Sequence, residues 1–109
     1  MVRVGIVDYK GFKGVGKTIY ETLVEKGYDV GFAKNLSELE SPQGFDVILC
    51  IPESASKSMP YFWASHPKIR TAIVTASEEE YFLKDEIPVI SYSGKKIIAF
   101  IEGKSLEGI

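Results

Sequence analysis

Residues 2–27, VRVGIVDYKGFKGVGKTIYETLVEKG, determine the fold of this 109-residue chain. The run Val2–Val7 is apolar and ends at Asp8, which is typical of a strand buried on both faces of a parallel sheet. A glycine-containing loop follows, and Thr18–Lys26 has helical spacing before Gly27 ends the helix. The apolar residues of this helix are expected on one stripe: Val15, Ile19, Tyr20, Leu23 and Val24. The order strand, loop, helix predicts the start of a βαβ unit.

The rest of the chain continues this alternation. Further strands are expected at Asp29–Ala33, Phe45–Ile51, Lys68–Thr75, Pro88–Tyr92 and Ile97–Ile101. Helices are expected from Ser37, which with Glu40 has capping-box spacing, to Pro42; near Pro60; and from Ser77 to about Lys84. The last two strands would form a hairpin around the turn Ser93–Lys96. The sequence therefore predicts one α/β domain over residues 1–109, a three-layer doubly wound, mostly parallel sheet of about five strands with a C-terminal antiparallel hairpin strand.

Composition and charge restrict the classes of function. Hydrophobic residues make up 45% of the chain and charged residues 26%, and the net charge is −2. Because the chain has no basic excess, no nucleic-acid partner is expected. No apolar run approaches the ~20 residues that cross a bilayer, so no membrane partner is expected either. The single cysteine, Cys50, lies in an apolar run and is interpreted as a packing residue of a reduced, cytoplasmic protein. One Asn and one Gln among many Lys and Glu suggest a thermophilic host.

The loop Gly11–Thr18, GFKGVGKT, fits the phosphate-binding pattern G-x-x-x-x-G-K-[ST] between a strand and a helix. In this interpretation Gly11, Gly14 and Gly16 let the backbone approach an anion, Lys17 supplies charge, and Thr18 ligates Mg²⁺ that accompanies a nucleotide. The alternative is a glycine turn with solvated lysines, in which Thr18 caps the helix. The sequence leaves both interpretations open.

Other polar residues follow the expected strands, at the sheet edge where ligands of α/β folds bind. These candidate ligand-binding residues are Asp8, Glu53 and Thr75. A second kind of contact is suggested by the aromatic cluster Tyr61, Phe62 and Trp63, which cannot all face inward from one short helix. Part of this cluster is expected to contact a protein partner or a second copy of the chain.

The loop resembles the Walker A loop of P-loop NTPases over about the first quarter of the chain. That resemblance implies that Lys17 contacts phosphate and Thr18 the magnesium ion. The sequence departs from the pattern because Asp8, Tyr9 and Lys10 separate the apolar strand from Gly11, and no apolar run ends in a second acidic residue. Ligand binding without hydrolysis is therefore expected, and no catalytic residue is assigned.

A second resemblance, to response-regulator receiver domains and other flavodoxin-like folds, covers nearly the whole chain. The similar segments are Val4–Asp8, Glu25–Val30 and Ala72–Ala76, with Lys95 or Lys96 near the position of the receiver lysine. The position of the phosphorylated aspartate holds Ile51, which cannot accept a phosphoryl group. The alternative function is thus a degenerate receiver-like interaction module without phosphotransfer, beside the main expectation of a small domain that binds a phosphate-bearing ligand.

Overall fold

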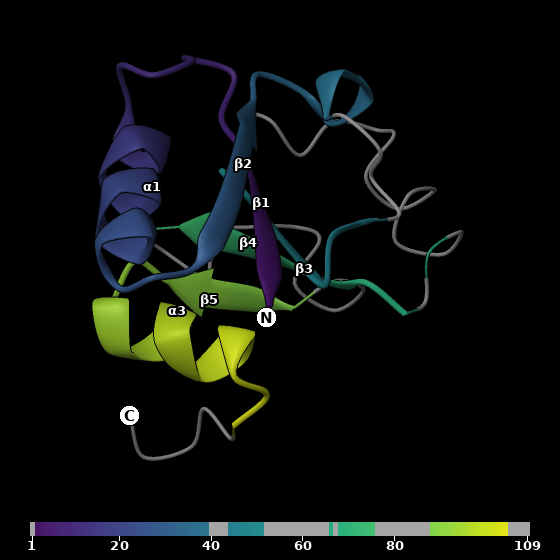
Figure 1. The fold of residues 1–109 in the computed structure, drawn as a ribbon. Helices are drawn as coiled ribbons and strands as arrows, with labels where there is room; N and C mark the ends of the chain where they lie inside the picture. Colours follow the sequence, from purple (N-terminus) through teal and green to yellow (C-terminus); the bar gives the residue numbers. More distant parts are fainter. Residues whose placement is uncertain (1, 40–43, 52–65, 67, 76–87, 105–109) are drawn as a thin grey trace.

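The computed structural model describes residues 2–39, 44–51, 66, 68–75 and 88–104. This part of the chain contains a five-stranded sheet with the order β2-β1-β3-β4-β5 (Figure 1). The strands are β1 (Arg3–Val7), β2 (Asp29–Ala33), β3 (Val47–Cys50), β4 (Arg70–Thr75) and β5 (Val89–Ser91). Every neighbouring pair is parallel, so the predicted α/β fold with a parallel sheet is confirmed.

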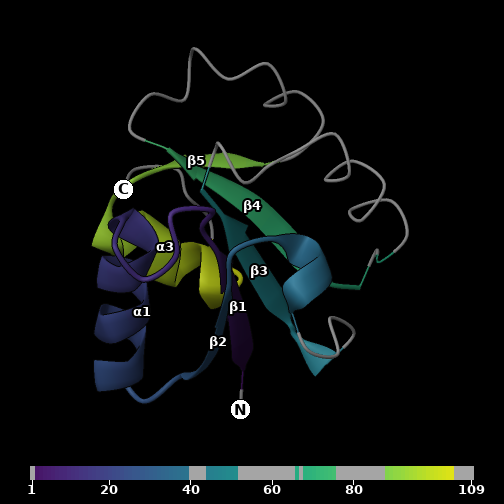
Figure 2. The ribbon, with the colours of Figure 1, turned by 90° about the horizontal axis from the view of Figure 1, so that it is seen from above.

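Two α-helices, α1 (Val15–Glu25) and α3 (Gly94–Ile101), cover one face of the sheet, and the short 3-10 helix η1 (Leu36–Glu38) lies on the other (Figures 1 and 2). Because strand residues alternate between faces, Ile6 and Leu49 pack under the α-helices, whereas Ile48 and Cys50 face η1. Three layers remain a prediction, since the helices expected near Pro60 and after Ser77 lie outside the described residues. Within the described ranges, no helix is long and apolar enough to cross a membrane.

The predicted C-terminal hairpin is wrong, because Gly94–Ile101 forms helix α3 instead of a turn and a strand. β5 pairs in parallel with β4, as a fifth strand of the same sheet. The run of isoleucines suggested a strand, but Ile97 and Ile101 are four residues apart and are buried together on one helical face. Gly103, at φ 73°, then ends the helix in a Schellman motif.

The end of helix α1 was predicted correctly at Gly27, but the helix begins at Val15, three residues before the expected start at Thr18. Gly27 adopts φ 92°, and its N–H donates to the Val24 oxygen at 3.0 Å. The predicted apolar stripe is wrong in part, because Ile19 and Leu23 are buried but Val15 and Val24 are exposed. At 100° per residue, Val24 is turned by about 140° from Ile19, which takes it off the sheet-facing side.

The short helix after β2 begins earlier than expected. Asn35 caps η1, its Oδ1 accepting the Glu38 N–H at 3.1 Å, so the expected capping role of Ser37 is wrong. This earlier start buries Leu36 and Leu39 in the core. Glu40 and Pro42 lie outside the described residues.

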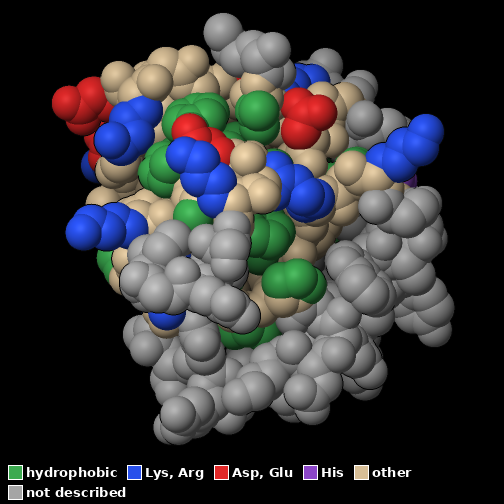
Figure 3. All heavy atoms as spheres, turned by 90° about the horizontal axis from the view of Figure 1, so that it is seen from below, with side chains coloured by type: hydrophobic (Ala, Val, Ile, Leu, Met, Phe, Trp, Pro, Cys, Tyr) green, Lys and Arg blue, Asp and Glu red, His purple; other side chains and the backbone are tan. Residues whose placement is uncertain are grey.

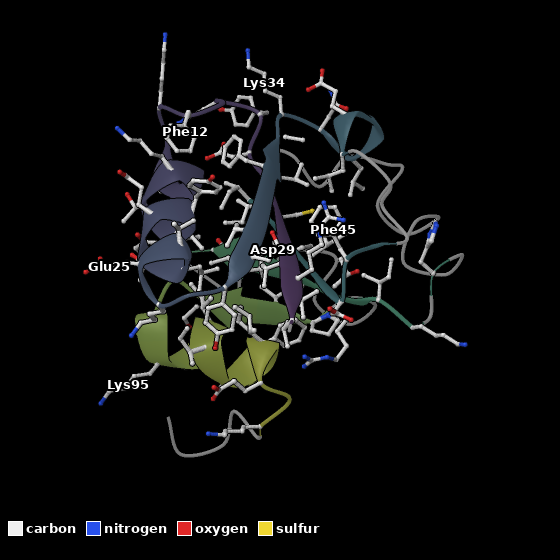
Figure 4. The ribbon with its side chains drawn as sticks, in the orientation of Figure 1. Phe12, Glu25, Asp29, Lys34, Phe45 and Lys95 are labelled. Carbon is white, nitrogen blue, oxygen red and sulfur yellow. The ribbon has the colours of Figure 1, made fainter. Side chains whose placement is uncertain are left out.

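On the face opposite the α-helices, the Phe45 ring (Figure 4) packs against the backbone of two glycines, which have no side chain. Gly5 and Gly31 are neighbours in the β1–β2 register, and a Cβ added to Gly31 would stand 2.7 Å from the Phe45 Cζ. The Arg3 guanidinium stands 4.4 Å from the ring centroid. Gly31 is therefore required for this packing, whereas a Cβ added to Gly5 would be in tight contact, 3.3 Å from the Phe45 Cδ1.

Candidate functional site

The candidate site is the loop between β1 and α1, at the carboxyl edge of the sheet (Figure 1). β1 has β2 on one side and β3 on the other, so the strand order reverses direction at β1. In open parallel sheets, ligands bind at this kind of reversal, beyond the ends of the strands. The predicted loop Gly11–Thr18 therefore lies where the topology favours a ligand.

The buried Asp8 side chain holds the loop through hydrogen bonds to the loop backbone. Asp8 directly follows β1, is only 1% exposed, and its N–H donates to the Ala33 oxygen at 3.0 Å. Its Oδ2 accepts the Gly16 N–H at 2.9 Å, and its Oδ1 accepts the Lys10 N–H at 3.0 Å. The N-terminus of α1 thus already holds a carboxylate, which interacts favourably with the partial positive charge of the helix end.

The glycines of the loop make room for this carboxylate. A Cβ added to Gly14 would stand 2.8 Å from the Asp8 Oδ2, and one added to Gly16 would stand 2.7 Å from the Asp8 Cβ. Gly11 adopts φ 65°. Its N–H donates to the backbone carbonyl oxygen of Asp8 at 2.9 Å, which closes a turn. Each of the three predicted loop glycines is therefore required by the protein's own packing.

Four lysines lie around the outer side of the loop. Lys10, Lys13 and Lys17 are exposed. Lys34 directly follows β2, and its side chain passes close to Gly11 (Figure 4). A Cβ added to Gly11 would stand 2.9 Å from the Lys34 Cε. The sequence did not assign Lys34 to the site, because only the parallel pairing of β1 with β2 brings it to the loop.

Aromatic rings fix the loop to α1 and β2. The Phe12 centroid lies 5.2 Å from that of Tyr20 and 5.2 Å from that of Phe32, both in edge-to-face geometry. Phe12 nevertheless remains 45% exposed and Tyr9 46%. The Lys17 Nζ lies 5.7 Å from the Phe12 centroid. The loop therefore presents aromatic rings beside ammonium groups, a combination that the glycine–lysine pattern did not reveal.

The other predicted site residues have different outcomes. Thr18 is exposed and lies inside α1, and the N-cap is Gly14, so the interpretation of Thr18 as the helix cap is wrong. Thr75 ends β4 at the same sheet edge as Asp8 but is separated from β1 by β3. Glu53 and the cluster Tyr61, Phe62 and Trp63 lie outside the described residues.

Metal-ligating and nucleophilic groups are sparse in the described part of the chain. No three His, Cys, Asp or Glu side chains there are grouped so that they could hold a metal ion. Cys50 is fully buried, and burial raises the pKa of its thiol above the ordinary value. The thiol therefore stays protonated at neutral pH and packs as a small apolar group.

Comparison with protein-family profiles, with curated protein sequences and with solved structures gives no match for this chain. Inference about its function consequently depends on the residues and geometry described above.

Proposed function

We propose that the chain is a small α/β domain that binds a phosphate-bearing ligand, of the nucleotide class, at the outer side of the Gly11–Thr18 loop. The observation that carries this proposal is the group of four lysines around a loop that stands at the strand-order reversal. The exposed ammonium groups attract phosphate by their charge, and the exposed Phe12 ring offers a face for a base.

The buried Asp8 determines how such a ligand would bind. Its carboxylate already accepts the Gly16 N–H, so a phosphate would not enter the loop as it enters a Walker A loop. Instead, the phosphates would lie above the glycines, held by Lys13, Lys17 and Lys34 as mobile point charges. This mode suits binding without turnover. Magnesium would come with the nucleotide, and the exposed Thr18 hydroxyl is its proposed ligand.

Calorimetric titration of the intact chain with ATP and with inorganic tripolyphosphate tests the proposal. We expect saturable binding of both, weakening as salt screens the charges. Lys17→Ala should weaken binding by about 5- to 10-fold, equivalent to roughly 1–1.4 kcal/mol. Lys68→Ala removes an exposed lysine beside β4 and should leave the affinity within about twofold of that of the native chain. Equal affinities for both variants, or no saturable heat at millimolar ligand, would refute the proposal.

A second candidate is a receiver-like interaction module without phosphotransfer. The order 2-1-3-4-5 is shared with flavodoxin-like folds, of which receiver domains are examples. Ile51, at the position of the phosphorylated aspartate, is only 7% exposed, and its N–H donates to the Val7 oxygen at 2.9 Å. A buried isoleucine there fits a module without phosphotransfer, for which Tyr61, Phe62 and Trp63 are the proposed contact residues with a partner. Light scattering separates the candidates, because this one predicts a mass that rises with concentration while phosphate titrations stay silent.

A further inference from the structure

A cleft of about 190 Å³ opens between α1 and α3, and its lining includes Lys26, at the end of α1 away from the loop. Its apolar walls come from both helices and from the segment after β5, and include Ile19, Leu23, Tyr92, Ile97 and Ile98. Three of these residues, Ile19, Leu23 and Ile97, belong to the core under the helices. Part of the cleft wall is therefore formed by core residues, whereas Tyr92, which also lines it, is exposed.

A wider, more open hollow adjoins the cleft and is rich in cations. The two share Lys26, Gly94 and Ile98, and the hollow adds Lys95 and Lys104. The acidic residue that lines the hollow, Glu102, already has partners within the protein. Its Oε1 lies 3.1 Å from the Lys104 Nζ, and its Oε2 accepts a hydrogen bond from the Tyr28 hydroxyl at 3.4 Å. Lys26 and Lys95 make no ion pair with any described residue. Figure 3 views the α3 side of the molecule, where apolar patches lie among both basic and acidic side chains.

We propose that this cleft binds a small amphipathic anion, namely a carboxylate that carries one aromatic ring or a short acyl chain. The volume sets the size of the apolar part, since an engineered apolar cavity of about 150 Å³ holds a benzene ring. Charge complementarity sets the head group, which would lie in the hollow near Lys26. Lys95 also lines the hollow and projects outward from the first turn of α3 (Figure 4). The positive end of α3 adds to this attraction.

Gly94 provides a way to close the cleft without disturbing the fold. It is the first residue of α3 and lines both the cleft and the hollow. A Cβ added there meets no atom within 4 Å, and its φ is not positive. Gly94→Leu should therefore fold normally and place its side chain where the ligand would lie.

The test is a titration of the intact ¹⁵N-labelled chain with 3-phenylpropanoate, followed by amide chemical shifts. We expect saturable shifts confined to residues 22–26 and 92–98. Gly94→Leu should weaken binding by more than about tenfold, and Lys26→Gln combined with Lys95→Gln by about fivefold. Lys68→Gln, the matched control, should leave the affinity unchanged. The neutral analogue 3-phenylpropan-1-ol should bind about fivefold more weakly than the acid.

Each of several results would overturn the inference. One is the absence of saturable shifts at millimolar acid, and another is a set of shifts outside the two ranges. Equal affinity for the acid and the alcohol would refute the anionic head group. If Gly94→Leu proves less stable in a thermal melt, the test depends on the double variant Lys26→Gln, Lys95→Gln. Unchanged affinity of that variant for the acid would refute the proposal. Failure here leaves the loop proposal untouched, because tripolyphosphate has no apolar part and the loop lies at the other end of α1.

Discussion

At the scale of single residues, Asp8 is the residue on which the loop depends. It is buried at the end of β1, and two backbone N–H groups of the loop donate to its carboxylate. The glycines at positions 14 and 16 are close enough to touch it. The loop is therefore ordered before any ligand arrives, which lowers the entropic cost of binding.

Asp8→Asn tests this role. The amide group would turn an NH₂ toward one of the two N–H donors, so one donor loses its acceptor inside the protein. We expect the free energy of unfolding to fall by about 1–3 kcal/mol in denaturant titrations. Asp29→Asn is the matched control, since Asp29 is exposed and lies 3.6 Å from Arg3, and it should stay within about 0.5 kcal/mol of the native chain. Equal stabilities of the two variants would refute the structural role of Asp8.

The sequence predicted the loop but not its internal organisation. The glycine–lysine pattern identified a loop that connects a strand to a helix, but its last four residues, Val15–Thr18, belong to the first turn of α1. The pattern takes no account of Asp8, which precedes Gly16 by eight residues and meets it only because the loop folds back over the strand end. Likewise, Lys34 joins the loop through strand pairing, which no local pattern encodes.

At the scale of elements, the two α-helices end in the same way. The N–H of Tyr28 reaches the Leu23 oxygen at 3.1 Å after α1, and the N–H of Lys104 reaches the Ala99 oxygen at 2.8 Å after α3. The glycine before each of these donors was readable in the sequence, but only Gly27 was interpreted as a helix end. Gly103 was not interpreted in this way because residues 97–101 are rich in isoleucine. β-Branched residues favour strands, so a strand was predicted there and no helix end was expected.

The ends of α1 and α3 are joined by the contact between Tyr28 and Glu102, and this contact predicts a pH effect. Partial burial, together with the charge and hydrogen bond of Glu102, raises the pKa of Tyr28 above its ordinary value of 10.0. The folded state then keeps the phenol proton longer than the unfolded state. The stabilisation is complete below about pH 10 and is lost as the pH rises through the folded-state pKa.

Urea titrations of the native chain and Tyr28→Phe between about pH 8 and 11 measure this effect. The native chain should lose more unfolding free energy above pH 10 than the variant does. Tyr92→Phe, which removes an exposed tyrosine outside this contact, should follow the native curve. Parallel curves for the native chain and Tyr28→Phe would contradict the assignment.

At the scale of the whole molecule, α1 connects two separate candidate sites. Its N-terminus follows the loop that carries the four lysines, and Thr22, Leu23 and Lys26 at its other end line the cleft against α3. The parallel sheet and the central position of β3 were predictable from apolar runs, since a strand buried on both faces lacks polar alternation. The cleft was not predictable, because it depends on Gly94–Ile101 being a helix rather than a strand.

The most direct test of the central claim is an amide-shift map of the intact ¹⁵N-labelled chain titrated with inorganic tripolyphosphate. We expect saturable shifts at residues 10–18 and at Lys34, while the Gly16 N–H still donates to the Asp8 carboxylate. Saturating shifts that spare the loop, or no saturation at millimolar ligand and low salt, would rule out binding at the loop.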